Sequence, residues 1–296
     1  MSRHAALALG VAIVSTAALL IRWAIDAGAS PLAIAAARLA LAAAVVVPLA
    51  LMRRRAELAA LRPRDWLIAA LSGALLAVHF ATWIASLQFT SVASSVALVT
   101  TNPWWVGLAS WWLLRESPSR KTLQGIALAA FGTALIIVSD LAQPEATIAS
   151  GRRPMLGNLL ALAGAMAISG YLLVGRRLNL KLSLLAYIAI VYGAAAVAMN
   201  LMASAAGQGI DRIPAAAWLP IALMALGPQL LGHTLINAAL RRLSATYVAL
   251  AILGEPVGSA ILAWLLLGES VAPLQLAGFA ALLAGIAVAA TGERSR

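Results

Sequence analysis

The chain has 296 residues, of which 63% are hydrophobic and only 10% are charged, and its mean hydropathy is +0.95. Because soluble domains carry roughly 25% charged residues, this composition excludes a soluble protein and indicates a multi-pass membrane protein. The formal net charge of +11 does not indicate a nucleic-acid partner, because the basic residues lie in short segments between apolar spans.

No cofactor and no metal ion are expected. The chain contains no cysteine, which excludes disulfides, thiolate metal ligands and cysteine nucleophiles. The three histidines, His4, His79 and His233, are too far apart in the sequence to indicate a zinc site. The chemistry of the chain therefore has to come from other polar side chains within the membrane.

Apolar stretches of about 20 residues, the length that crosses a bilayer, recur along the whole chain. We expect ten transmembrane helices, at 4–25, 31–51, 66–88, 91–114, 120–139, 156–175, 183–204, 217–238, 244–267 and 272–290. The first span is longer than the core of a signal peptide and is followed by further spans, so we expect it to be a retained helix.

The distribution of basic residues predicts the orientation of these spans. If the N-terminus is cytoplasmic, 16 of the 21 lysines and arginines lie on the inner side, three lie in outer loops, and Arg22 and Arg38 lie within spans. Inner loops of membrane proteins carry such an excess of positive charge. We therefore expect both termini to be cytoplasmic, in a bacterial-type inner (plasma) membrane.

Two segments, 91–117 and 244–270, share one pattern at a constant offset of 153 residues. At this offset the dipeptide Asn102-Pro103 corresponds to Glu255-Pro256. Further matches pair Glu116 with Glu269, Gly125 with Gly278, and Gly132 with Gly285. The chain is therefore interpreted as a duplication, with a first repeat at 1–140, a periplasmic connecting loop at 141–155 and a second repeat at 156–296.

Each repeat is expected to contain five helices, an odd number, so the second copy must enter the membrane from the opposite side. Inverted repeats are typical of secondary transporters, in which two related halves surround a site near the bilayer midplane and give alternating access. The predicted fold class is thus an all-α integral membrane protein with ten transmembrane helices in two inverted five-helix repeats. Since both halves lie in one chain, a monomer is sufficient for function.

The prolines of the repeated dipeptides lie in the middle of apolar spans. A proline removes a backbone hydrogen bond from a helix, so Pro103 and Pro256 are candidate hinges. Gly254 and Gly258 flank the second proline and lower the resistance to bending there. A static kink is the alternative interpretation.

Two charged residues lie inside spans, where charge is costly unless it faces protein or water. Glu255 can bind a proton during transport, contact the substrate, or cap backbone groups that the proline leaves free, and its repeat counterpart Asn102 cannot titrate. Arg38 can receive a substrate carboxylate, or it can snorkel or pair within the protein. The structural role is favoured for Arg38.

Polar residues recur at helical spacing in the third and fourth spans. A helix places His79, Thr82, Trp83 and Ser86 on one face. A second stripe consists of Ser91, Ser94, Ser95, Leu98, Thr101, Asn102 and Trp105. Such stripes line either a cavity or a helix contact, because serine and threonine also let helices approach closely. For His79 with Trp83 the cavity interpretation is favoured.

The second half carries a comparable set. Gln229, His233 and Asn237 recur every four residues on the eighth span and belong either to the pathway or to an interhelical hydrogen-bond ladder. Tyr247 shares a face of the ninth span with Glu255. The candidate substrate-binding residues are therefore His79, Trp83, Ser94, Thr101, Asn102, Trp105, His233, Asn237, Tyr247 and Glu255.

The segment from Ala249 to Glu269, with its Glu-Pro pair and closing Leu-Leu-Leu-Gly-Glu, resembles the drug/metabolite transporter superfamily, EamA-type. The resemblance covers nearly the whole chain and the motif occurs twice in register, although the first copy has Arg115-Glu116 where Gly-Glu is usual. The stretch Asn102-Pro-Trp-Trp105 is similar to the YddG-type exporters of aromatic and other neutral amino acids. The resemblance implies a basket of ten helices around a central cavity, with the fourth and ninth spans moving at their prolines.

The resemblance also implies a transporter of a small-molecule substrate, with aromatic and other neutral amino acids expected. Such a molecule needs an aromatic pocket for its ring, which Trp83, Trp105 and Tyr247 can supply, and polar groups for its charged end. A proton-coupled exporter of small drugs or other metabolites is the alternative, which Glu255 keeps open. An intramembrane enzyme is a distant alternative, because the ten acids are scattered and no catalytic motif accompanies them.

Overall fold

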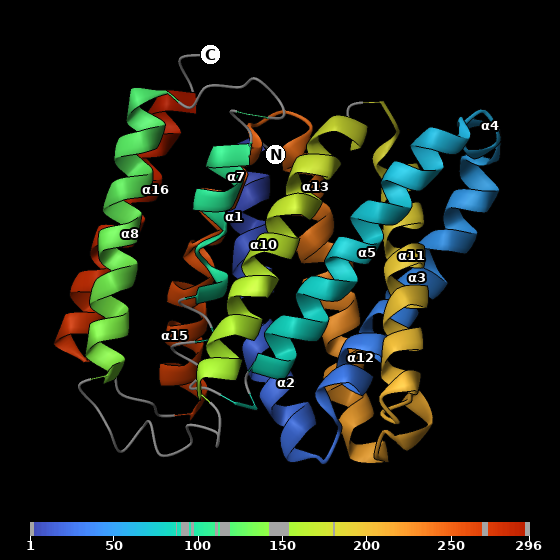
Figure 1. Cartoon of the computed structure of the whole chain (residues 1–296), viewed down its shortest axis with the longest axis horizontal. Coiled ribbons are helices and arrows are strands. Elements are labelled where there is room, and N and C mark those ends of the chain that lie inside the picture. Colours follow the sequence, from blue (N-terminus) through green and yellow to red (C-terminus); the bar gives the residue numbers. More distant parts are fainter. Residues whose placement is uncertain are drawn as a thin grey trace.

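The computed structural model of the protein describes residues 3–86, 88–89, 95, 98–109, 112, 119–141, 154–179, 181–267 and 272–293. The elements in these residues are all helices, and they stand side by side in a bundle (Figure 1). The first half contains α1 (Arg3–Val14), α2 (Ala17–Asp26), α3 (Pro31–Arg53), α4 (Arg55–Ala59), α5 (Pro63–Ser86), α7 (Asn102–Ala109) and α8 (Arg120–Leu141).

The second half begins with α10 (Pro154–Asn179) and α11 (Leu184–Ala205), followed by the short 3₁₀ turns η2 (Ile210–Arg212) and η3 (Ala215–Ala217). The remaining elements are α12 (Trp218–Met224), the π-helix η4 (Ala225–His233), α13 (Thr234–Leu240), α14 (Ala245–Ile252), α15 (Gly254–Leu267) and α16 (Pro273–Glu293). In the described residues, eight helical segments are long and apolar enough to cross a membrane. The expected span at 91–114 lies partly outside the described residues.

Several helices begin where a serine can cap them. The hydroxyl oxygens of Ser30, Ser183 and Ser244 accept a hydrogen bond from the backbone N–H three residues later, at 3.4, 3.3 and 3.2 Å. Such caps satisfy one of the backbone donors that have no partner in the first turn of a helix. The turns between spans therefore carry local signals that fix where α3, α11 and α14 start.

The helix expected over 4–25 is two helices, α1 and α2, separated by a turn at Ser15 and Thr16. The Ser15 hydroxyl donates to the Val11 carbonyl at 2.9 Å, and the Thr16 hydroxyl donates to the Ile13 carbonyl at 2.8 Å. Hydroxyl side chains that bond the preceding turn in this way bend helices. A candidate span is present at Arg3–Asp26, as expected, but its backbone is interrupted inside the span. Apolar composition defines a span without revealing where its backbone bends.

The spans that contain Pro103 and Pro256 are interrupted at matching positions. Thr100 and Thr101 form a turn before α7, and Leu253 separates α14 from α15, so the expected continuous helix over 244–267 is also two helices. Thr100 and Leu253 are 153 residues apart, which is the offset of the two repeats. Each break lies directly before its proline, where the proline ring clashes with the carbonyl of the preceding helical turn.

The eighth span departs from regular α-helical geometry as well. Its middle third is the π-helix η4, which contains Pro228, instead of the α-helix expected over 217–238. π-Helical turns are rare and are found mostly as short insertions at functional sites. Apolar periodicity predicts that a helix is present but cannot distinguish these two windings.

α8 and α16 pack against each other at one edge of the bundle (Figure 1). Their backbones meet at glycines, with Gly125 against Gly285 and Gly132 against Gly278. Because the residue numbers rise on one helix as they fall on the other, the two helices are antiparallel. Small residues permit this close approach of membrane helices. By sequence offset Gly125 corresponds to Gly278 and Gly132 corresponds to Gly285, so each glycine of α8 contacts the counterpart of the other one.

We expect Gly132→Ala to destabilise the protein by about 1–3 kcal/mol, the usual cost of overpacking. A Cβ at this position would lie 2.7 Å from the backbone nitrogen of Leu282, so the α16 backbone has to shift. Gly193→Ala in α11 is the matched control, because its Cβ would meet only the Val47 side chain, at 3.4 Å. The melting temperature of the purified protein should fall for the first variant and stay constant or rise for the control. Equal melting temperatures would contradict the prediction.

The other helix contacts also occur in corresponding pairs. α5 of the first half packs on α10 and α11 of the second half, and η4 of the second half makes the corresponding contacts with α1 and α3 of the first half. In the same way, α7 packs on α10, and α14 and α15 pack on α1. The contacts between α3 and α11 and between α8 and α16 join corresponding helices of the two halves, and the contact between α7 and α14 joins the corresponding fourth and ninth spans. Figure 1 places the start of α1 and the end of α16 at the same end of the bundle.

Candidate functional site

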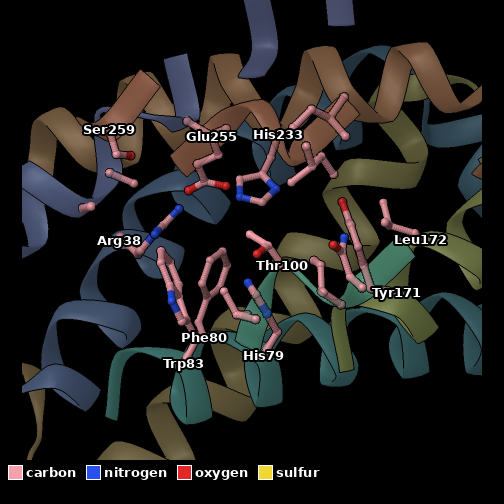
Figure 2. Close-up of a pocket in the computed structure, with 18 residues that line it drawn as sticks. Arg38, His79, Phe80, Trp83, Thr100, Tyr171, Leu172, His233, Glu255 and Ser259 are labelled. Atoms are coloured by element: carbon pink, nitrogen blue, oxygen red, sulfur yellow. The ribbon is translucent and has the colours of Figure 1, made fainter. Parts of the chain in front are cut away.

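A cavity of about 60 Å³ lies in the middle of the bundle. Its walls come from both halves of the chain, and the breaks in the first, fourth and ninth spans all border it. The polar and aromatic residues on its walls, most of them labelled in Figure 2, include Arg38, His79, Phe80, Trp83, Asn102, Tyr171, His233 and Glu255. The bundle therefore gathers its intramembrane charges and several rings around one small central space.

Arg38 lies on α3 and is completely buried, with 0% of its surface exposed, so it does not snorkel to the membrane interface. Its Nη2 donates to Gln229 Oε1 at 2.9 Å, and its guanidinium carbon lies 4.2 Å from the centroid of the Phe80 ring. The second contact is a cation–π interaction. Nε and Nη1 have no hydrogen-bond partner. Since buried donors are nearly always paired, these two N–H groups mark a place for an anionic acceptor.

Glu255 lies in the first turn of α15, directly after the break at Leu253. Figure 2 shows its carboxylate pointing into the same space as the Arg38 guanidinium. The two groups interact electrostatically across the cavity. The first turn of a helix also favours a negative charge, because the helix dipole is positive there. The cavity thus presents one guanidinium and one carboxyl group.

The rings of His79, Phe80 and Trp83 lie across the cavity from Glu255, and the His233 ring lies beside Glu255 (Figure 2). The His79 and Trp83 rings stack with centroids 5.8 Å apart, and the Phe80 ring meets the His233 ring edge-on at 5.5 Å. His79 Nδ1 lies 3.0 Å from the Gly164 carbonyl oxygen, an acceptor, so this nitrogen carries the proton. The other ring nitrogen of a neutral His79 is then an acceptor. Trp83 Nε1 has no hydrogen-bond partner and adds a donor to the same wall.

Asn102 borders the cavity at the start of α7. Its side-chain oxygen has no hydrogen-bond partner, and its backbone carbonyl accepts from the Ser169 hydroxyl on α10 at 3.2 Å. Glu255 holds the corresponding position in the second half. Each repeat therefore places a polar side chain beside a helix break, and the side chain is neutral in the first repeat and acidic in the second.

Two candidates from the fourth span lie beside the cavity instead of on its wall. The Thr101 hydroxyl donates to the Leu98 carbonyl at 2.7 Å and accepts from Trp105 Nε1 at 3.3 Å. These bonds join the two side chains to each other and to the backbone around the break. Ser94, a further candidate, lies outside the described residues.

Two candidates from the second half are also placed elsewhere. Asn237 accepts from the Tyr171 hydroxyl at 2.8 Å, and so supports a residue of the cavity wall from behind. The Tyr247 hydroxyl lies 3.4 Å from His4 Nδ1, close to the start of α1. The break at Leu253 separates α14 from α15, so Tyr247 does not continue the face of Glu255 as an unbroken helix would require.

The glycines beside Pro256 permit close packing. A Cβ on Gly258 would lie 2.7 Å from Ser15 Cβ, and the neighbouring Ser259 hydroxyl donates to the Ser15 carbonyl at 2.9 Å. A Cβ on Gly254 would lie 3.2 Å from a Val11 methyl group. α15 therefore rests directly on the α1–α2 break.

Several wall residues were not candidates from the sequence, namely Phe80, Thr100, Tyr171 and Ser259. Phenylalanine and hydroxyl residues are common throughout membrane spans, so their presence alone carries no signal. A buried arginine does imply an aromatic or polar partner, but the sequence does not show that Phe80 and Gln229 are the partners of Arg38.

Comparison with known proteins identifies the family. The EamA-like transporter family matches twice, at residues 2–138 and 155–291. The uncharacterized transporter YyaM of Bacillus subtilis (strain 168) is 23% identical over 213 residues, which are 71% of this chain and 68% of the relative. The uncharacterized transporter YetK of the same organism is 31% identical over 99 residues, which are 33% of this chain and 29% of the relative.

A solved crystal structure covers 99% of this chain and 100% of its own, with a TM-score of 0.76 and 20% sequence identity, and so shows the same fold. The described helices are long and apolar enough for several membrane crossings, and the two family matches together cover most of the chain. The protein belongs to the EamA-like transporter family of the drug/metabolite transporter superfamily and is a multi-pass membrane transporter.

Proposed function

We propose that the protein exports aromatic and other neutral amino acids across a bacterial inner membrane through the central cavity. The observation that carries this proposal is the presence of Arg38 and Glu255 in one cavity beside aromatic rings. An amino acid has a carboxylate for a guanidinium and an ammonium group for a carboxylate. The two unpaired donors of Arg38 suit a carboxylate bound at two points.

The proposed architecture is ten spans in two inverted repeats, 1–140 and 156–296, joined by a periplasmic loop at 141–155. Three observations support it: the breaks at Thr100 and Leu253 correspond, the helix contacts occur in exchanged pairs, and the family matches twice. The excess of basic residues on one side supports cytoplasmic termini. Because both halves of the cavity come from one chain, the proposed functional unit is a monomer.

Alternating access is part of the proposal because the cavity is small. Its volume of about 60 Å³ is less than half of the about 150 Å³ of an apolar cavity that binds benzene, so binding of an amino acid requires the walls to move. The breaks before Pro103 and Pro256 border the cavity and lack regular helical bonding, which makes them suitable hinges. The tight contact of Gly258 with Ser15 supports transmission of movement from α15 to the first span.

A proton-coupled exporter of cationic small drugs is the second candidate, and Glu255 in the cavity is the observation that favours it. Arg38 argues against it, because a fixed positive charge in the same cavity repels a cation. A zwitterion meets no such repulsion. The amino acid is therefore the better match to both charges.

The test is uptake of labelled phenylalanine, tryptophan, leucine and a cationic dye by liposomes that contain the purified protein, with and without a proton gradient. We expect amino-acid uptake that persists when the gradient is dissipated and is absent from empty liposomes. Uptake of the dye alone, driven by the gradient, would overturn the proposal and establish the drug exporter.

A further inference from the structure

A second cavity, of about 170 Å³, lies beside the first and has no assigned role. It lies between α7, α8 and α14 and is lined mainly by apolar groups, among them Pro103, Trp104, Ile126, Ala130 and Leu253. In contrast to the central cavity, those of its lining residues that the structure describes include no charged side chain. The membrane part of the protein thus contains a small charged cavity and a larger apolar cavity.

The wall between these two cavities is built from the helix breaks. Thr100 borders both cavities. In the fourth span Asn102 faces the central cavity and Pro103 the second one, and in the ninth span Glu255 faces the first and Leu253 the second. The interruptions of the fourth and ninth spans therefore lie between the two spaces.

The size of each cavity suits one part of an amino acid. An apolar cavity of about 150 Å³ is large enough to hold benzene, and the second cavity has about 170 Å³. The central cavity is too small for a ring but carries the charges that a zwitterionic end needs. A single amphipathic molecule would fill both.

We propose that the second cavity is the subsite for the apolar side chain of the substrate. The charged end then lies between Arg38 and Glu255, the chain passes Thr100, and the ring or branched group lies between α7, α8 and α14. This inference rests on the proposed function, and it explains how a closed structure with a small central cavity can accept large neutral amino acids. It also makes the second cavity the determinant of substrate size.

Ala130→Leu in α8 tests the proposal, because the larger side chain fills the second cavity without touching the central one. We expect phenylalanine and tryptophan transport to fall by about 10-fold or more, as steric changes in apolar pockets can produce. Transport of alanine and serine should stay within about twofold, since they leave the subsite empty. Ala127→Leu is the matched control, because Ala127 is exposed on the same helix and borders neither cavity. Equal losses for large and small substrates, or no loss, would overturn the proposal.

Photo-cross-linking with p-azidophenylalanine gives a readout that does not depend on transport. The azide on the ring should label peptides that contain residues 120–141, because α8 lines the second cavity and not the central one, and excess phenylalanine should prevent the labelling. Labelling confined to 63–86 or 225–240 would place the ring in the central cavity and overturn the inference while leaving amino-acid binding intact.

The bilayer offers another possible occupant, because the Trp104 side chain is 53% exposed at the edge of the second cavity. If a lipid chain fills the space, Ala130→Leu should alter transport of all substrates equally and in proportion to acyl-chain length in the liposomes. That result would overturn the subsite. Failure of the proposed function is distinguishable, since the unmodified protein would then neither transport nor cross-link any amino acid.

Discussion

Replacing Arg38 with glutamine is expected to reduce amino-acid transport by about 30-fold or more without reducing stability. Removing one member of a buried charge pair typically costs 2–5 kcal/mol of binding, and about 1.4 kcal/mol is a factor of ten. The same substitution removes a fully buried cation that has two unpaired donors. A buried charge whose hydrogen bonds are incomplete carries a desolvation cost, and its removal relieves that cost, so the fold is not expected to lose stability. Loss of transport together with an equal or higher melting temperature is the expected signature.

Arg22→Gln is the control for this variant. Arg22 lies on α2 with its side chain exposed, so the same change of residue type should leave both transport and melting temperature nearly unchanged. If Arg38 instead has the structural role that the sequence favoured, Arg38→Gln should lose the bond to Gln229 and the contact with Phe80, and the melting temperature should fall. Transport per folded molecule would then stay close to that of the unmodified protein.

The helical membrane character could be predicted from composition and periodicity, because spans of apolar residues have few alternatives in a bilayer. The interruptions at Ser15 and in η4 could not, since a hydroxyl that bonds its own helix and a π-helical turn leave the apolar pattern unchanged. The breaks before Pro103 and Pro256 were anticipated at the prolines, as bends within continuous helices. They are interruptions of the helix just before each proline.

The site was accessible to sequence reasoning only in part. Helical spacing shows which residues of one helix share a face, and so it grouped His79 with Trp83, which do stack. It does not show which faces of different helices meet. Arg38 contacts Phe80 and Gln229 across such faces, and Tyr247 contacts His4 in the same way. Contacts of this kind depend on the packing of segments far apart in the chain.

The duplication has a consequence for the chemistry of the cavity. Asn102 and Glu255 are equivalent by sequence offset, follow equivalent breaks and border the same cavity. If the two repeats had the same residue at the positions of Asn102 and Glu255, both halves of the cavity would present the same polar group. An amino acid, however, has two different charged groups. Divergence to an amide on one side and an acid on the other gives the cavity one negative charge to complement Arg38.

Glu255→Gln is expected to reduce transport of neutral amino acids by at least about 10-fold, because the ammonium group of the substrate loses its partner. The remaining cavity holds Arg38 as its charged group and should accept a carboxylate without an ammonium group. We therefore expect the variant, and not the unmodified protein, to transport 3-phenylpropionate. Uptake of both labelled compounds into the same liposome preparation measures this change of specificity.

An assay of phenylalanine exchange across the membrane distinguishes substrate binding by Glu255 from proton coupling by Glu255. If Glu255 binds substrate, Glu255→Gln should lose exchange of internal unlabelled for external labelled phenylalanine as well as net uptake. If Glu255 carries only the coupling proton, exchange should persist without a gradient, because no net proton movement is needed, and 3-phenylpropionate should remain excluded. The neutral counterpart Asn102 means that one half of the cavity has no titratable group at this position, so a carboxyl group in the other half is expected to serve the asymmetry of the substrate.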